Sequence, residues 1–81
     1  MSTEERQEAL SRHGLVETED GFELTLAGFR KASRRALDFR KQGDPEAARM
    51  LALGPSDPLR WEYARCLAID SFTAEVHQSR I

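Results

Sequence analysis

The sequence contains a single cysteine, Cys66, so no disulfide can close within the chain. One cysteine gives no sign of the disulfide-stapled scaffolds that small secreted proteins use. It also leaves too few ligands for a structural zinc site, because the two histidines, His13 and His77, are dispersed along the chain. We therefore expect a cytoplasmic protein with no metal and no cofactor.

Long apolar runs are also missing. Nowhere do eighteen apolar residues follow one another, and residues 1–20 are charged, so we expect neither a membrane span nor a signal peptide. Only five glycines and three prolines interrupt the 81 residues, and 40% of the chain is hydrophobic, which is typical of one mostly helical domain. A domain of this size has a small core, which favours association with a partner.

Patterns that indicate catalysis are absent from the sequence as well. We find no glycine-rich phosphate loop, no paired-carboxylate motif and no pair of histidines at helical spacing. Cys66 lies in an apolar helical run, so we expect it to be a small buried side chain. The sequence therefore predicts a protein without enzymatic activity and without catalytic residues.

The charges that are present have an uneven distribution. Residues 1–25 carry seven acids against Arg6 and Arg12, a balance of −5. Residues 26–41 carry six bases against Asp38, a balance of +5, and the rest of the chain has six acids and four bases. The chain therefore has an acidic first third and a basic middle segment. The seven acids of the first third are Glu4, Glu5, Glu8, Glu17, Glu19, Asp20 and Glu23.

Four helices are predicted from their start and stop signals. The first begins with a capping pattern, Ser2 followed three residues later by a glutamate, and ends at Gly14, because glycine tolerates the left-handed conformation that ends helices. Aspartate followed by proline starts the last two helices, since aspartate caps and proline is pre-set for the first helical position. The predicted helices cover residues 3–13, 26–42, 45–53 and 58–77.

A β-hairpin is predicted over residues 15–25. Apolar and polar residues alternate on both sides of an Asp-Gly pair at residues 20–21, and this is a strong signal for two antiparallel strands joined by a tight turn. We expect Val16, Phe22 and Leu24 to point into the core.

The helix predicted over residues 26–42 has two different faces. Its apolar residues recur at helical spacing and define a face toward the core. Its basic residues lie on the opposite face and are Arg30, Lys31, Arg34, Arg35 and Lys41.

The helix predicted over residues 58–77 carries more apolar surface than one side can bury. We expect it either to lie at the centre of the domain or to form part of a subunit or partner interface, including a homodimer. The predicted core consists of Leu10, Val16, Phe22, Leu24, Phe29, Ala36, Phe39, Met50, Leu53, Trp61, Ile69 and Phe72.

The run from Gly14-Leu15-Val16 through the Asp-Gly turn to Leu24-Thr25 and Gly28 resembles the wing and following helix of winged-helix transcriptional regulators. The resemblance covers about residues 8–37. It implies that helix 3–13 occupies the place of the recognition helix and that the hairpin touches phosphates. A complete winged helix has two further helices before this one. The expected fold is therefore mainly α with one β-hairpin, in the order α-β-β-α-α-α, a truncated winged-helix-like domain.

The acidic hairpin has the wrong sign for DNA, because affinity for the phosphate backbone comes from lysine and arginine. Our first hypothesis is therefore a protein-binding module, adaptor or inhibitor. The seven acids of residues 1–25 would occupy the basic groove of a nucleic-acid-handling complex, as small phage-encoded inhibitors do. The alternative is a nucleic-acid-binding or transcription-regulatory protein that contacts phosphates through the basic face of helix 26–42. If it does not bind nucleic acid, this basic face of helix 26–42 is simply exposed to solvent.

Overall fold

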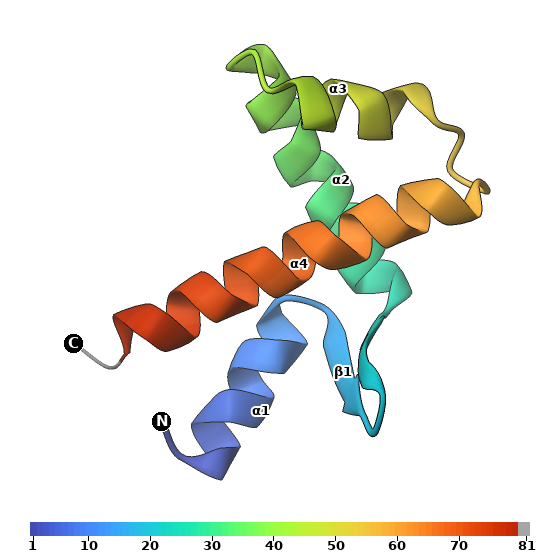
Figure 1. Ribbon diagram of the computed structural model, residues 1–81. Helices are drawn as coiled ribbons and strands as arrows, with labels where there is room; N and C mark the ends of the chain where they lie inside the picture. Colours follow the sequence, from blue (N-terminus) through green and yellow to red (C-terminus); the bar gives the residue numbers. More distant parts are fainter. Residues whose placement is uncertain (80–81) are drawn as a thin grey trace.

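The computed structural model describes residues 1–79, and its elements follow the expected order α-β-β-α-α-α. A mainly helical fold with one two-stranded antiparallel hairpin is therefore confirmed. None of the helices in this range has the length and apolar character needed to cross a membrane. The elements are α1 (Thr3–Arg12), β1 (Leu15–Thr18), β2 (Gly21–Leu24), α2 (Leu26–Lys41), α3 (Pro45–Ala52) and α4 (Pro58–Gln78), as shown in Figure 1.

The helices begin at the residues that their start signals indicate. The Ser2 hydroxyl accepts a hydrogen bond from the Glu5 amide at 3.1 Å, and the Glu5 carboxylate accepts one from the Ser2 amide at 3.5 Å. Asp44 and Asp57 cap α3 and α4, each accepting a hydrogen bond at 2.9 Å from an amide of the first turn. These side chains satisfy amides that have no partner inside their helix, which sets where each helix starts.

The long helix α4 crosses the middle of the molecule and crosses α2 there, with α3 on one side of α4 and α1 and the hairpin on the other (Figure 1). Its first half packs on α2 and α3, where the rings of Phe29 and Trp61 stack with centroids 4.1 Å apart. Its second half packs on α1 and the hairpin, where the ring centroids of Phe72 and Phe22 lie 5.9 Å apart.

The buried residues of α4, Ala64, Ala68 and Phe72, recur every four residues and therefore lie on one stripe, while Leu59 and Cys66 are exposed. The neighbouring elements thus cover α4 along its length, but burial on two sides of the helix is not confirmed. Dimerisation through α4 stays a prediction.

The prediction that Val16 belongs to the core is wrong. Val16 is 49% exposed, whereas its neighbour Leu15 is 4% exposed. In the antiparallel register Leu15 lies opposite Leu24 and Val16 lies opposite Glu23. Opposing residues share one face of a hairpin, so Val16 is on the solvent face together with a glutamate.

Cys66 and Leu53 also differ from expectation. Cys66 is exposed rather than buried. It lies two residues from the buried Ala64 and from the buried Ala68, and two residues turn a helix by about 200°, which places Cys66 on the opposite side of α4. Leu53 is only partly buried, because it follows the last residue of α3 with an extended backbone and leaves the helix there.

Gly14 joins α1 and the hairpin to the start of α2. Its φ of 67° lies in the left-handed region, which favours glycine. The Gly14 carbonyl accepts hydrogen bonds from the amide of Thr25 at 2.9 Å and from the Thr25 hydroxyl at 3.0 Å. The same hydroxyl accepts one from the Gly28 amide at 3.1 Å and so caps α2. These bonds hold the base of the hairpin against the first turn of α2.

Candidate functional site

The acids of the first third gather at one end of the molecule. Figure 1 shows that the first turn of α1 and the turn of the hairpin point the same way, away from α2 and α3. Arg6 of α1 forms an ion pair of 2.6 Å with Glu17 of β1, which ties the helix to the hairpin. We call the seven exposed acids of α1 and the hairpin the acidic end; they are Glu4, Glu5, Glu8, Glu17, Glu19, Asp20 and Glu23.

Two of these seven carboxylates have partners within the chain. Glu5 belongs to the capping pattern of α1, and Glu17 accepts hydrogen bonds from Arg6. The hydrogen bond from Arg6 holds the pKa of Glu17 below its ordinary value, so this carboxylate keeps its charge. Among residues 1–79, the other five form no side-chain hydrogen bond or ion pair: Glu4, Glu8, Glu19, Asp20 and Glu23.

Apolar surface lies beside the acidic end. A shallow hollow runs between α1, β1 and the first turn of α2, with Leu15, Val16 and Ala27 among its lining residues. Val16 is exposed there, and the neighbouring Leu26 is 55% exposed. Exposed apolar side chains bordered by charges are typical of a surface that binds another protein.

The five predicted basic residues of α2 do not act as one face. All are exposed, but Lys31 donates a hydrogen bond to the Arg12 carbonyl and Arg35 donates one to the Ser71 hydroxyl. These two side chains therefore lie against α1 and α4. The other three bases are Arg30, Arg34 and Lys41. Arg34 follows Arg30 by four residues and Lys41 follows Arg34 by seven, which places all three on one stripe of α2.

A third arginine, from α4, joins this stripe. Arg60 lies over the ring of Phe29, with its guanidinium carbon 5.5 Å from the ring centroid, and donates a hydrogen bond of 3.0 Å to the Leu53 carbonyl. It lines a hollow that contains no acidic residue. We call this the arginine hollow; it consists of Phe29, Arg30, Ser33, Arg34 and Arg60. Sequence reasoning missed Arg60, because it is far from α2 along the chain.

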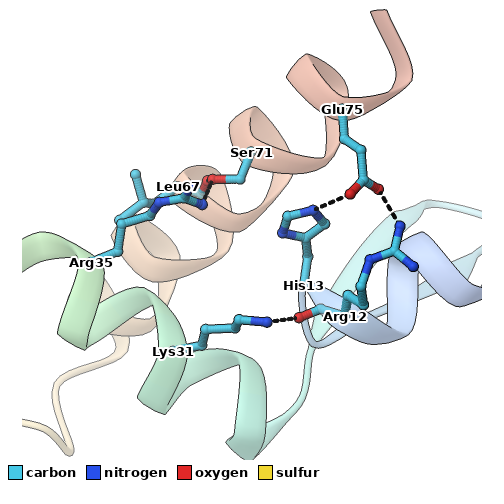
Figure 2. A network of polar contacts seen from close by, with 7 residues as sticks. All are labelled: Arg12, His13, Lys31, Arg35, Leu67, Ser71 and Glu75. Atoms are coloured by element: carbon cyan, nitrogen blue, oxygen red, sulfur yellow. Dashed lines mark hydrogen bonds and ion pairs between the residues drawn. The ribbon is translucent and has the colours of Figure 1, made fainter. Parts of the chain in front are cut away.

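A polar network links the end of α1 to α2 and α4 (Figure 2). Arg12 of α1 donates a hydrogen bond of 2.9 Å to the carboxylate of Glu75 in α4. Lys31 of α2 reaches the Arg12 carbonyl, as described above. On the other side of the network, Ser71 accepts the hydrogen bond from Arg35. We call the four groups that converge here the cationic cluster; they are Arg12, His13, Lys31 and Arg35.

His13 lies at the centre of this network. Its side chain is 15% exposed, and its Nε2 atom is buried without a hydrogen-bond partner among the described residues. The nearest carboxylate oxygen, on Glu75, is 3.8 Å away, which is too far for a hydrogen bond. Burial lowers the pKa of His13, and the positive charges of Lys31, Arg35 and Arg12 lower it further, while Glu75 opposes them. His13 is therefore neutral at pH 7.

The network holds charge rather than activating a nucleophile. The Ser71 hydroxyl donates its proton to the Leu67 carbonyl at 3.0 Å, so that proton points away from His13. Within residues 1–79, no group of three histidine, cysteine, aspartate or glutamate side chains is placed to hold a metal ion. Of the three permanent cations in the network, Arg12 pairs with Glu75, whereas Lys31 and Arg35 bind neutral acceptors.

No sequence signal identifies the cationic cluster. The contact between Arg12 and Glu75 joins residues 63 positions apart, and the contact between Arg35 and Ser71 joins residues 36 positions apart. Periodicity and capping patterns extend over only a few residues, so they do not reveal which distant side chains meet.

Comparison with protein-family models, with curated proteins and with solved structures finds no match to this chain. The resemblance to winged-helix regulators therefore stays a prediction based on residues 8–37. A function for the chain has to be argued from its surfaces.

Proposed function

We propose that the chain is a small non-enzymatic binding module, an adaptor or inhibitor, whose acidic end docks on a basic surface of a protein partner. The observation that carries the proposal is the five exposed carboxylates at one end of the molecule that have no internal partner among the described residues. Charges that are not neutralised within a protein attract a partner of opposite sign and raise the rate of association.

A nucleic-acid-handling complex is the partner that we favour. Such complexes present grooves lined by lysine and arginine, and a truncated winged-helix-like domain with an acidic coat has the shape and charge to occupy one. The chain would then act as the phage-encoded inhibitors named above do. Val16 and Leu26 supply exposed apolar contacts beside the acids, and burial of such side chains is what gives interfaces much of their binding energy.

Reversing two of the unpaired acids should abolish capture of the partner. We expect wild-type protein on a column to retain a stoichiometric partner from nuclease-treated lysate at low salt and to release it as salt rises, because charge attraction is screened. The variant Glu8→Lys with Glu19→Lys should retain none. Quantifying the eluted protein by mass spectrometry and gel density measures the effect.

The matched control for this experiment is Asp38→Lys with Asp70→Lys. Both of its acids are exposed and lie outside the acidic end, and the pair raises the net charge by the same amount. Capture should be unchanged. Equal loss in both double variants would point to net charge alone, and absence of any stoichiometric partner for the wild type at low salt would count against the proposal.

Nucleic-acid binding through the arginine hollow is the second candidate. The observation that favours it is three arginines around one hollow that contains no acid. Lys41 extends the same stripe of α2, whereas Lys31 and Arg35 contribute less, because both are engaged by α1 and α4. This surface would contact phosphates rather than bases, so binding should depend weakly on sequence and steeply on salt.

Gel shifts at about 50 mM salt with duplex DNA, single-stranded DNA and RNA test this candidate. We expect Arg30→Gln with Arg34→Gln to weaken binding and to reduce the slope of log affinity against log salt by about two, since each phosphate contact contributes about one. The control Arg40→Gln with Arg49→Gln removes two exposed bases elsewhere and should keep the slope. If no probe shifts, the second candidate is wrong.

A further inference from the structure

The cationic cluster surrounds a hollow between α1, α2 and α4. The hollow encloses about 20 Å³ and opens to solvent at its mouth. Lys31 and Arg35 line it from α2, His13 lines it from the end of α1, and Ser71 lines it from α4. Figure 2 shows these side chains coming from three separate elements, with Lys31 extended to the Arg12 carbonyl and Arg35 to Ser71. The walls of the hollow are mainly apolar, and its charged donors come from Lys31 and Arg35.

Positive charge exceeds negative charge at this hollow. Arg12, Lys31 and Arg35 are cations, and Glu75 is the single carboxylate that the described network contains. Glu75 is engaged by Arg12 at 2.9 Å. Lys31 and Arg35 meet a carbonyl and a hydroxyl, both of which are neutral acceptors. One ammonium and one guanidinium group therefore extend from α2 to neutral acceptors on α1 and α4, and neither is paired with an acid among the described residues.

The remaining contacts show why the two cations stay there. Arg35 and Lys31 lie four residues apart on α2, so their charges repel each other. Each is held in place by one hydrogen bond across to another element. Both hydrogen bonds have a charged donor and a neutral acceptor, so neither joins opposite charges. An anion at the hollow would add the attraction between opposite charges.

We propose that the mouth of this hollow binds a phosphate or sulfate group of a small ligand. Lys31 and Arg35 donate to its oxygens, Arg12 contributes charge at the rim, and Ser71 and His13 line the wall. The inference goes beyond the proposed function, because it uses neither the acidic end nor the arginine hollow. A tetrahedral dianion fits the donor set, since arginine offers a fork of N–H groups and lysine a compact charge.

His13 gives the site a dependence on pH. In the free protein its pKa is lowered by burial and by Lys31, Arg35 and Arg12, with Glu75 acting in the opposite direction. Below that pKa the ring becomes a cation and adds one more charge to the hollow. Anion binding and protonation of His13 therefore favour each other, so affinity for the anion should rise as pH falls.

Titration of the wild-type protein with sodium sulfate at constant ionic strength tests the proposal. Sulfate keeps the same charge across the working range of pH, which makes it a cleaner probe than phosphate. We expect saturable amide shifts in two-dimensional NMR spectra, centred on His13, Lys31 and Ser71. Shifts that do not saturate, or that centre on the arginine hollow instead, would overturn the inference.

The variant Lys31→Gln with Arg35→Gln should weaken sulfate binding by about tenfold or more, because each replaced group donates a charge-assisted hydrogen bond. The control Arg40→Gln with Arg49→Gln removes two exposed bases from outside the hollow and should bind as the wild type does. Circular dichroism checks that both variants are folded. Equal binding by all three proteins would show that the hollow is not the site.

Sulfate titrations at different pH values separate the contribution of His13 to binding from that of the permanent cations. Because the pKa of His13 is lowered from the ordinary histidine value of about 6.5, sulfate affinity of the wild type should rise as pH falls below that value. His13→Gln should remove that rise and leave the affinity at the higher pH nearly unchanged. A wild-type affinity that stays flat as pH falls below that value would contradict the place of His13 in the wall of the site.

Discussion

Gly28→Ala is expected to destabilise the fold by about 3 kcal/mol, the upper part of the range for overpacked sites. A Cβ atom at Gly28 would lie 2.5 Å from the Gly14 carbonyl oxygen and 2.7 Å from the Leu24 Cδ1 atom. The carbonyl has no freedom to move away, because the Thr25 amide and hydroxyl both donate to it. The added methyl must therefore separate the base of the hairpin from α2. The midpoint of urea denaturation, followed by circular dichroism, measures the loss.

Gly54→Ala is the matched control for this substitution. Nothing lies within 4 Å of a Cβ atom at Gly54, and its φ is not positive. We expect a change within about 0.5 kcal/mol, as for most surface substitutions. If Gly28→Ala and Gly54→Ala unfold at the same urea concentration, the close approach of Gly14 and Gly28 does not limit the packing of the hairpin.

Phe72→Ala should cost about 3–5 kcal/mol, the usual range for removal of a buried aromatic ring. Phe72 is 3% exposed and is shared by three parts of the molecule. Its ring lies 5.9 Å from that of Phe22 in the hairpin and 6.4 Å from that of His13, and the guanidinium carbon of Arg6 lies 5.2 Å from its centroid. A chain of this length has about 4–12 kcal/mol of stability in total, so this variant should be partly unfolded at 37 °C.

Thermal and urea denaturation measure the effect of Phe72→Ala, with Leu59→Ala as the control. Leu59 is on the same helix but is 52% exposed, so its truncation should change stability by about 0.5 kcal/mol or less. A similar loss in both variants would mean that α4 is uniformly sensitive. A loss confined to Phe72→Ala would show that this ring joins α1 and the hairpin to α4.

The helices and the hairpin could be predicted because their signals are local. The side chains of Ser2 and Glu5 each accept a hydrogen bond from the other's backbone amide. The Asp44 and Asp57 side chains each accept one from an amide in the first turn of α3 or α4. The exposure of the seven acids follows from their charge, since a charged side chain stays in water unless it is paired, whereas their position at one end depends on how α1 and the hairpin are arranged.

The buried faces were harder to predict, because both faces of an element can carry apolar residues. Leu15 and Val16 are adjacent and similar, so alternation alone does not say which of them points inward. The contact with α1 and α4 decides it, and Leu15 is the buried one. The prediction that Cys66 is buried is wrong for the same reason. The helix α4 is apolar around much of its circumference, and the elements packed against it determine which side is covered.

By itself, then, the sequence determined the number, type and limits of the elements and the segregation of acids and bases along the chain. Caps, turns and periodicity act over a few residues and need no partner elsewhere. Only the tertiary structure decided which side chains meet. It placed Arg30 and Arg34 at the arginine hollow and Lys31 and Arg35 in the cationic cluster, because α4 crosses α2 and brings Arg60 to one flank and Ser71 and Glu75 to the other. These contacts depend on how the helices pack against one another, and no short sequence pattern encodes that packing.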